Sequence, residues 1–236
     1  MARKPKSRRS RPSSRTAEPS PANTRDKIIA AFMALLAETP FERIELAEVA
    51  SKAKASLAEL RGEFSSTLAI LAAHIKAIDR AVLAGGDADM AEETPRERLF
   101  DVLMRRLELL NPHKDAARSL LRSARRNPGL ALALNTLAVR SQQWMLTAAG
   151  IGAAGPRGMV RAQGLALMFA NVLRVWIDDG DAGQATTLAA LDRELERGQR
   201  LAGLLDDLCS LPERICSMTR RSRRPRGRGR AERAAA

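Results

Sequence analysis

Residues Phe41 to Leu71, FERIELAEVASKAKASLAELRGEFSSTLAIL, carry the clearest structural pattern of the chain. Their apolar positions repeat as on two short helices separated by a short break. The inward positions are Ile44, Leu46, Val49, Ala50 and Ala53 on the first helix and Leu57, Leu60 and Phe64 on the second. Ser56 is the predicted N-cap of the second helix, because its hydroxyl can accept a free backbone N–H there. The pattern predicts a helix–turn–helix, whose second helix is suited to the major groove of DNA.

This stretch, with the predicted helix before it, resembles the DNA-binding end of the TetR/AcrR family of bacterial repressors. The matching residues are Ile28, Ile29, Ala31, Phe32, Leu35, Leu36, Leu46, Val49, Ala50, Ala53, Ser56, Leu60, Phe64, Ser66 and Leu71. The resemblance implies an all-α, TetR-like fold: an N-terminal three-helix DNA-binding domain with a helix–turn–helix, a connector helix and a C-terminal helical bundle. It also implies a homodimeric transcriptional regulator, expected to be a repressor, that binds a double-stranded DNA operator.

Four positions depart from the usual pattern of that family. Lys54 stands where the family usually has a turn glycine, and Glu59 where it usually has Ser or Thr. Arg61 replaces a Tyr and Thr67 a Lys, both of which usually touch DNA phosphates. The residues expected to contact DNA are Lys52, Lys54, Ser56, Leu57, Ala58, Glu59, Arg61 and Thr67. Arg61 is the leading candidate, because arginine can bind a phosphate or a guanine edge.

The positive charge of the chain is concentrated at its two ends. The formal net charge is +13, yet residues 24–213 are close to neutral. Residues 1–23 contain seven Lys or Arg and one Glu, and residues 214–236 contain nine Arg and one Glu. Such ends are either disordered solubilising tails or contacts to a polyanion. Because residues 41–71 carry five Glu against four Lys or Arg, the arm at 1–23 is a candidate to supply cations in the adjacent minor groove.

The rest of the sequence predicts helices, since Ala, Leu, Arg and Glu are abundant and strand-like alternation is weak. Helices are expected over about 24–38 (capped by Thr24), 67–83, 94–110, 112–126, a further segment ending near 149, 159–178, 182–200 and 201–211. The expected domains are a basic disordered arm (1–23), a DNA-binding domain with connector (24–84), a ligand-binding and dimerisation domain (95–211) and an Arg-rich disordered tail (212–236).

An effector pocket and a dimer interface are expected in the helical bundle. The candidate pocket residues, for a small apolar effector, are Leu103, Met104, Leu107, Trp144, Met168 and Trp176. A filled core without a cavity is the alternative for these residues. The helices over 159–178 and 182–200 correspond to those that usually dimerise in the resembling family. The candidate interface residues are Phe169, Leu173, Leu188, Leu191 and Leu195, and the central core helix of a monomer is the alternative for 159–178.

Residues 174–200 also resemble the C-terminal part of the coenzyme Q nine family of ubiquinone-biosynthesis accessory proteins. The shared residues are Trp176, Asp178, Thr187, Leu191, Asp192 and Leu195. That family has a TetR-like fold but binds isoprenoid lipid and membrane, so the alternative function is a lipid-binding accessory protein at a membrane surface. Residues 201–218 would then form an interfacial amphipathic helix, although such an apolar stripe more commonly packs on its own protein.

No catalytic or metal-binding constellation is visible in the sequence. His74 and His113 stand alone, and the spacing of Cys209 and Cys216 fits neither a disulfide framework nor a metal site. The aspartates at 178, 179 and 181 are expected to cap the following helix, because the glutamate of a calcium-binding loop is missing. We therefore expect no enzymatic activity, no cofactor and no metal, and a cytoplasmic protein without a transmembrane segment.

A run of arginines leaves two interpretations open. Arg118, Arg122, Arg125 and Arg126 share one face of a predicted helix. A solvated face paired with Asp115 or Glu108 is the favoured interpretation. An anion-binding site is the alternative.

Overall fold

The computed structural model describes residues 21–86, 90 and 92–200, and the regular structure among them is entirely helical. The helices are α1 (Pro21–Glu38), α2 (Leu46–Ala53), α3 (Leu57–Glu63), α4 (Thr67–Ala84), α5 (Pro95–Leu110), α6 (Lys114–Arg126), α7 (Pro128–Ala148), α8 (Gly155–Trp176) and a last helix over 185–200. Short 3-10 turns, η1 (Phe41–Arg43) and η3 (Asn111–His113), precede α2 and α6. The all-α expectation is confirmed. Residues 1–20 of the arm expected over 1–23, the helix over 201–211, both cysteines and the Arg-rich tail lie outside the described residues. Residues 21–23 belong to α1, so the expected arm ends too late.

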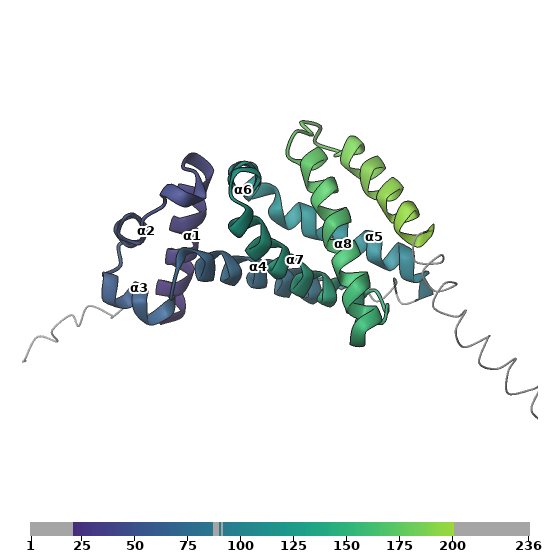
Figure 1. The fold of residues 1–236 in the computed structure, drawn as a ribbon, viewed down its shortest axis with the longest axis horizontal. Coiled ribbons are helices and arrows are strands. Elements are labelled where there is room, and N and C mark those ends of the chain that lie inside the picture. Colours follow the sequence, from purple (N-terminus) through teal and green to yellow (C-terminus); the bar gives the residue numbers. More distant parts are fainter. Residues whose placement is uncertain (1–20, 87–89, 91, 201–236) are drawn as a thin grey trace, which may run out of the picture.

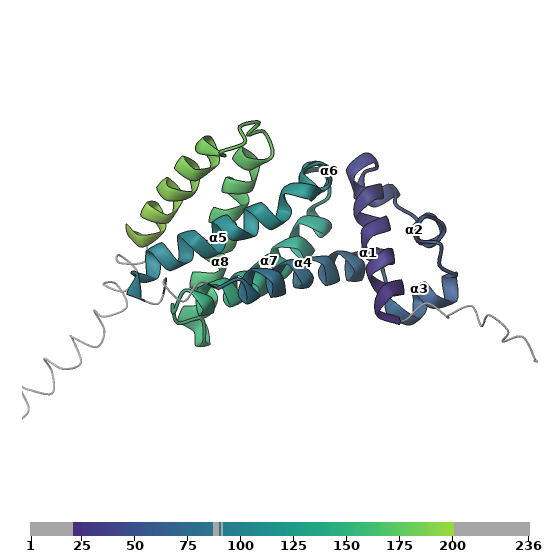
Figure 2. The same ribbon diagram turned by 180° about the vertical axis from the view of Figure 1, so that it is seen from behind.

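The molecule is elongated, with α1, α2 and α3 at one end and α5, α7, α8 and the last helix at the other (Figure 1). The view from behind shows α4 running lengthwise from the first group into the second (Figure 2). Two hydrophobic cores correspond to these two groups of helices.

The first core forms where α1 packs against α2, α3 and the start of α4. Ile28, Phe32 and Leu36 are fully buried and stand four residues apart on α1, so they form one continuous helical face. Val49 from α2 and Ile70 from α4 are also fully buried against this face. Each such side chain contributes about 1.5–3 kcal/mol by leaving water, which is enough to hold three short helices together.

The second core forms inside the bundle around α8. Leu103 and Leu107 of α5, Met145 of α7 and Val172 and Trp176 of α8 are all fully buried there. The indole N–H of Trp176 donates a hydrogen bond of 3.1 Å to the side-chain oxygen of Asn111, which satisfies the polar end of this large side chain. The apolar face predicted for the helix over 159–178 is therefore used within this chain.

Two helices connect the cores. α4 contributes Ile70 and Leu71 to the first core and Ile78 and Val82 to the second. α6 packs along α1 and buries Ala116 in the first core, although the sequence placed this helix in the second domain. Polar contacts reinforce this junction: the Ser119 hydroxyl donates to the Thr39 carbonyl, and the Phe41 N–H donates to the Ser123 hydroxyl. The two groups of helices are therefore joined along α4 and α6 rather than by a flexible linker.

Several helix boundaries differ from the expected ones. α1 begins at Pro21, so Thr24 lies inside the helix and not at its cap; a proline is compatible with a first turn because its missing N–H would have no partner there. α8 begins at Gly155, four residues before the predicted start. Gly158 is required in this first turn, because a Cβ would lie 2.1 Å from the Ala153 carbonyl carbon. No described helix combines the length and hydropathy needed to cross a bilayer.

Candidate nucleic-acid interface

A tight turn at Lys54 sets the angle between α2 and α3. Lys54 has φ 54° and ψ 40°, which is the left-handed region, and its N–H donates to the carbonyls of Ala50 and Ser51. Helices commonly end on a residue in this conformation, which is usually a glycine, and a side chain there costs about 1–2 kcal/mol. The resemblance implied a glycine at this position. The chain instead keeps the turn geometry and adds an exposed amine.

The start of α3 is closed by a reciprocal cap between Ser56 and Glu59. The Ser56 hydroxyl accepts the Glu59 N–H at 3.1 Å, and the Glu59 carboxylate accepts the Ser56 N–H at 2.7 Å. This confirms Ser56 as the N-cap. The bonds from the Ser56 backbone and then from its hydroxyl lower the pKa of Glu59, since both favour the ionised form. Glu59 therefore has a local structural role at the position where the family usually has Ser or Thr.

Three contacts hold α3 against α1. Leu60 is 2 % exposed and is the one residue of α3 in the buried core. The Arg25 guanidinium pairs with the Glu63 carboxylate at 3.0 Å and lies 4.6 Å from the centre of the Phe64 ring. These contacts lie on the inner face and at the C-terminal end of α3. The outer face of α3 is therefore exposed to solvent.

The predicted DNA contacts gather on that outer face and on the turn before it. Lys52, Lys54, Ser56, Leu57, Ala58, Glu59 and Arg61 are all exposed, and Thr67, the first residue of α4, is half-buried. Leu57 is 58 % exposed in a helix of only seven residues, so the expectation that it faces inward is wrong. The predicted contacts on α3 therefore share an accessible surface at one end of the molecule.

Four of the six residues predicted to line the effector pocket belong to the second core. Leu103, Leu107, Met168 and Trp176 are buried in the second core, where they pack against other side chains. Trp144 is 60 % exposed on α7, so the expectation that it lines the interior is wrong. Its position on α7 follows Ser141 and Gln142, which are buried, so the helix turns Trp144 outward.

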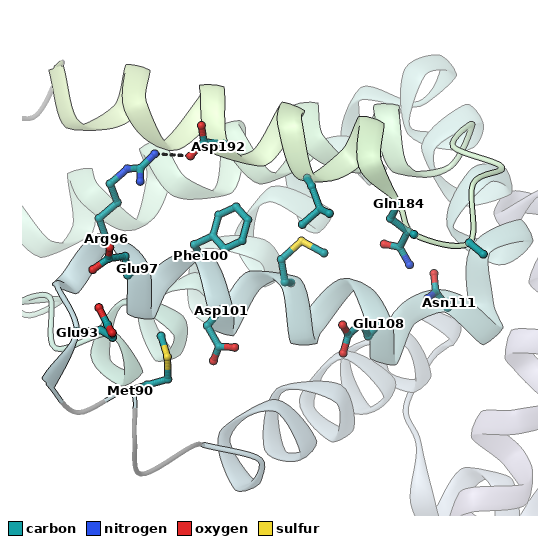
Figure 3. Close-up of a pocket in the computed structure, with 14 residues that line it drawn as sticks. Met90, Glu93, Arg96, Glu97, Phe100, Asp101, Glu108, Asn111, Gln184 and Asp192 are labelled. Atoms are coloured by element: carbon teal, nitrogen blue, oxygen red, sulfur yellow. Dashed lines mark hydrogen bonds and ion pairs between the residues drawn. The ribbon is translucent and has the colours of Figure 1, made fainter.

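A groove with a volume of about 840 Å³ lies instead between α5 and the last helix (Figure 3). Met104 is the only predicted pocket residue that lines it, together with Phe100 and Leu188. The carboxylates on the groove belong to Glu93, Glu97, Asp101, Glu108 and Asp192. Arg96 pairs with Asp192 at one end, and Gln184 and Asn111 lie at the other. The groove is thus acidic as well as apolar, whereas the sequence analysis expected a purely apolar site.

Three predicted dimer-interface residues are unavailable for a partner. Phe169, Leu191 and Leu195 are at most 5 % exposed, because they fill the second core of their own chain. Leu173 and Leu188 are half-buried. The exposed apolar side chains of α8 are instead Met159, Val160 and Leu167, on its opposite face. Helical periodicity located the apolar helix but could not distinguish which of its faces is used inside the chain.

A buried polar network in the bundle was missed by the sequence analysis. Asp79 of α4 accepts hydrogen bonds from Arg106 of α5 at 2.5 Å and from Ser141 of α7 at 2.8 Å, and Arg106 also donates to Ser141. The Arg106 guanidinium lies 5.5 Å from the centre of the Phe169 ring. All three polar residues are at most 8 % exposed, and burial lowers the pKa of Arg106 while Asp79 opposes that shift. The network links the connector helix to two helices of the bundle.

The two histidines, which were expected to stand alone, contact each other. Their ring centroids are 4.5 Å apart in an edge-to-face arrangement, with His74 on α4 and His113 in η3. Burial, then the positive charges of His113 and Arg106, lower the pKa of His74 from 6.5 to about 4. His74 is therefore neutral at neutral pH. No sequence spacing signals this pair, since the fold brings the two positions together.

Two of the three aspartates after α8 contact the start of the last helix as expected, whereas Asp178 lies 3.8 Å from Arg118 instead. Asp179 accepts hydrogen bonds from the N–H and hydroxyl of Thr187, and Asp181 accepts the N–H of Ala185. These bonds with Thr187 are the main reason that the pKa of Asp179 is lowered. Within the described part of the chain, no three His, Cys, Asp or Glu side chains gather as they would around a metal ion.

Comparison with known proteins establishes the fold. No model of a known protein family matches the chain. No curated protein matches it either. Among solved structures, the TetR transcriptional regulator from Nitrosomonas europaea ATCC 19718 is similar, with a TM-score of 0.59 and 21 % identity over 74 % of this chain and 97 % of that chain. A TetR transcriptional regulator from Rhodococcus sp. RHA1 has a TM-score of 0.54 and 20 % identity over 75 % of this chain and 96 % of that one. The chain therefore has a TetR-like fold.

Proposed function

We propose that this protein is a DNA-binding transcriptional regulator that acts as a homodimer, with repression as the expected outcome. The observation that carries the proposal is the capped, outward-facing α3 beside the left-handed turn at Lys54. The helix presents Leu57, Ala58 and Arg61, while Leu60 attaches it to the first core. This arrangement has the size and exposure needed to enter a major groove.

Each predicted contact has a separate role in this proposal. Lys52, Lys54 and Ser56 meet the phosphate backbone, which sets the position of the protein on the duplex. Leu57, Ala58 and Arg61 meet base edges, where an alkyl side chain can contact a thymine methyl and arginine can bind guanine. Glu59 and Thr67 lie beside these contacts. Because Glu59 remains ionised, it disfavours close phosphates on its side of the helix and so helps to fix the docking angle.

The exposed face of α8 is the proposed dimer contact. Val160, Gly164, Leu167 and Asn171 are exposed and follow one another at intervals of four, three and four residues, the spacing of a helix–helix seam. No atom lies within 4 Å of a Cβ built on Gly164, so a large residue there leaves the fold of the single chain intact. Gly164→Arg should therefore give monomers in analytical ultracentrifugation, while Lys76→Glu, on exposed α4 surface, should not. A dimer that survives Gly164→Arg contradicts this interface.

The groove between α5 and the last helix is the proposed effector site. Phe100, Met104 and Leu188 can hold an apolar body, and its volume of about 840 Å³ fits a drug-sized molecule. An effector that wedges α5 from the last helix would shift α4 through the Asp79–Arg106 contact and so alter the spacing of the two α3 helices.

The test is selection of fragmented genomic DNA by the purified full chain over a salt series, followed by sequencing of the bound fragments. A regulator should recover one palindromic motif that survives moderate salt. On that motif, Arg61→Ala should weaken binding by about 1–3 kcal/mol. Arg80→Ala, which removes an equally exposed arginine from α4, is the control and should leave the affinity unchanged.

The opposite result has a clear meaning. Binding that is independent of sequence, falls steeply with salt and disappears when residues 1–20 and 212–236 are deleted would show that only the basic ends hold DNA. The regulator proposal then fails, and binding to liposomes and to extracted isoprenoid lipids becomes the test of the lipid-binding alternative.

A further inference from the structure

A second, smaller pocket of about 290 Å³ lies between α6 and the C-terminal end of α8. Four arginines line it: Arg118, Arg122 and Arg125 of α6 and Arg174 of α8. Ile177 and Asp178 close one side. Four guanidinium groups around one small pocket, with a single carboxylate among them, are an unusual concentration of one charge.

Part of this charge has a structural explanation. Arg118 donates a hydrogen bond to the Ile177 carbonyl and pairs with Asp115 and Asp178. Lys114, one turn earlier on α6, donates to the Asp179 carbonyl. Arg118 thus covers a carbonyl at the C-terminal end of α8, which carries partial negative charge, and Lys114 covers a carbonyl of the loop that follows. These contacts fix Arg118 in place and use up its acidic partners.

The other three arginines are not explained in this way. In the part of the chain that the structure describes, neither Arg122 nor Arg125 has a carboxylate partner. Among the described residues, Arg174 donates to the side-chain oxygen of Asn171, one turn earlier on α8, and has no carboxylate partner. Holding three guanidinium groups around one pocket costs electrostatic free energy, and a bound anion would reverse the sign of that contribution.

We propose that this pocket binds a compact polyanion that carries phosphate or carboxylate groups. Arg122 and Arg125 approach the anion from α6 and Arg174 approaches it from α8, while Arg118 supplies a fixed charge behind them. Planar guanidinium groups suit both ligand types, because each can donate two parallel hydrogen bonds to an oxyanion. The volume of the pocket selects a small anion, not an extended chain.

The position of the pocket gives the bound anion a route to the rest of the molecule. α6 is the helix that packs along α1, through Ala116 and through the bonds from Ser119 and to Ser123. An anion shared by Arg122 and Arg174 would tie α6 to α8, and so would fix the junction between the two cores. Anion binding is expected to raise the stability of the folded chain by mass action.

The test uses isothermal titration calorimetry of the full chain with pyrophosphate and, separately, with citrate, at low and at physiological ionic strength. Arg122→Gln/Arg125→Gln should weaken the better-bound anion by about tenfold or more, as expected for the loss of charge-assisted contacts. Arg174→Gln, a change on α8 instead of α6, should also weaken binding of the same anion. The control is Arg80→Gln/Arg140→Gln, which removes two exposed arginines from outside the pocket and should leave affinity within about twofold. Circular dichroism verifies the fold of each variant.

Each outcome decides the proposal. A loss restricted to the pocket variants supports it, and the preferred anion identifies phosphate or carboxylate as the ligand group. Equal affinity in all variants overturns the proposal, because binding would then reside in the Arg-rich ends. An equal loss of affinity in the control also overturns it, because overall charge and not this pocket would then explain the loss. In a separate titration with random duplex DNA, a parallel loss of affinity in the pocket variants also overturns the proposal, because these arginines would then be a DNA contact. The titrations with pyrophosphate and citrate contain no DNA. The anion proposal can therefore fail while the proposed operator binding stands, and operator binding can fail while the anion proposal stands.

Discussion

The two ends of this molecule use polar residues in opposite ways. At the end formed by α1, α2 and α3, polar contacts lie at or near the surface, as in the Ser56–Glu59 cap and the Arg25–Glu63 pair. In the bundle, Asp79, Arg106 and Ser141 are buried and come from three helices. The first arrangement leaves a helix face open for a partner, whereas the second fixes helices relative to one another. The difference suggests that polar groups shape an exposed surface at one end and couple helices to one another at the other end.

The largest effect is expected when the buried network of Asp79, Arg106 and Ser141 is broken. Arg106→Ala leaves Asp79 buried without its charged partner, and should lower the free energy of unfolding by about 3–5 kcal/mol. Urea denaturation followed by circular dichroism measures this change. Arg197→Ala removes an arginine whose side chain is 69 % exposed and which pairs with Glu194, so it should cost less than about 1 kcal/mol.

A companion variant shows whether the charge itself is needed. Asp79→Leu/Arg106→Met replaces both partners by apolar groups and should be less damaging than Arg106→Ala. If the double variant is the worse of the two, the network contributes net stability and not merely a penalty when it is broken.

The second effect tests the attachment of α3 at the opposite end. Leu60→Ala opens a cavity beneath this helix and should cost about 2 kcal/mol, the low end for a buried leucine because α3 lies at the edge of the first core. Leu57→Ala is the control on the same helix: because Leu57 is 58 % exposed, stability should change by less than about 0.5 kcal/mol. Operator affinity should show the reverse order once the loss of folded protein is taken into account. Equal stability losses would mean that the outer face of α3 is not free.

The third effect is a loss of about 2 kcal/mol in the free energy of unfolding at pH 5, caused by the buried His74 of the bundle. The pKa of His74 is about 4 in the folded chain and 6.5 in the usual reference. Between these values the unfolded chain binds a proton that the folded chain does not, so stability is full above about pH 6.5 and falls with decreasing pH. The maximal slope is about 1.4 kcal/mol per pH unit.

The measurement is the free energy of unfolding between pH 5 and 6.5, a window in which carboxylates stay largely ionised. His74→Gln should flatten this profile without abolishing the fold. A variant with the same slope as the parent would assign the acid sensitivity to other groups.

The smallest effect is expected at the exposed Ser56–Glu59 cap of α3. Ser56→Ala removes both the hydroxyl acceptor of α3 and one partner of Glu59, and should cost about 1 kcal/mol. Thermal unfolding measures it, with Ser65→Ala, an exposed serine of the loop after α3, as the control. A cost as large as that of Arg106→Ala would show that the two ends do not differ in the way described above.

The sequence alone was sufficient to predict most of the structure of α2 and α3, because the signals for these helices are local. Ser56 as the N-cap, and Leu60 and Phe64 at helical spacing, encode the start and the buried side of α3 within one short segment, although Leu57 was wrongly assigned to that side. The same logic located the helix starts at Thr94 and the aspartates before the last helix. The boundary at α1 was missed because Thr24 resembles an N-cap, whereas the helix already begins at Pro21.

The candidate sites in the bundle were harder to predict, because they depend on which face of each helix meets which neighbour. Phe169 was assigned to a partner chain but packs within its own core, and Trp144 was assigned to the interior but lies outside. Asp79 and Arg106 are 27 residues apart, so no spacing rule connects them. The arginine face of α6 was recognised in sequence, but the pocket completed by Arg174 required the packing of α6 on α8.

The placement of the two tryptophans gives the chain a built-in optical reporter. The sequence contains no tyrosine, so near-ultraviolet emission comes almost entirely from Trp144 and Trp176. Trp144 is open to solvent, whereas Trp176 is fully buried, bonded to Asn111 and 5.3 Å from the Lys114 ammonium. A water-soluble quencher should remove the first signal and leave the second. The remaining emission would then follow events at the junction of α6 and α8 without any label.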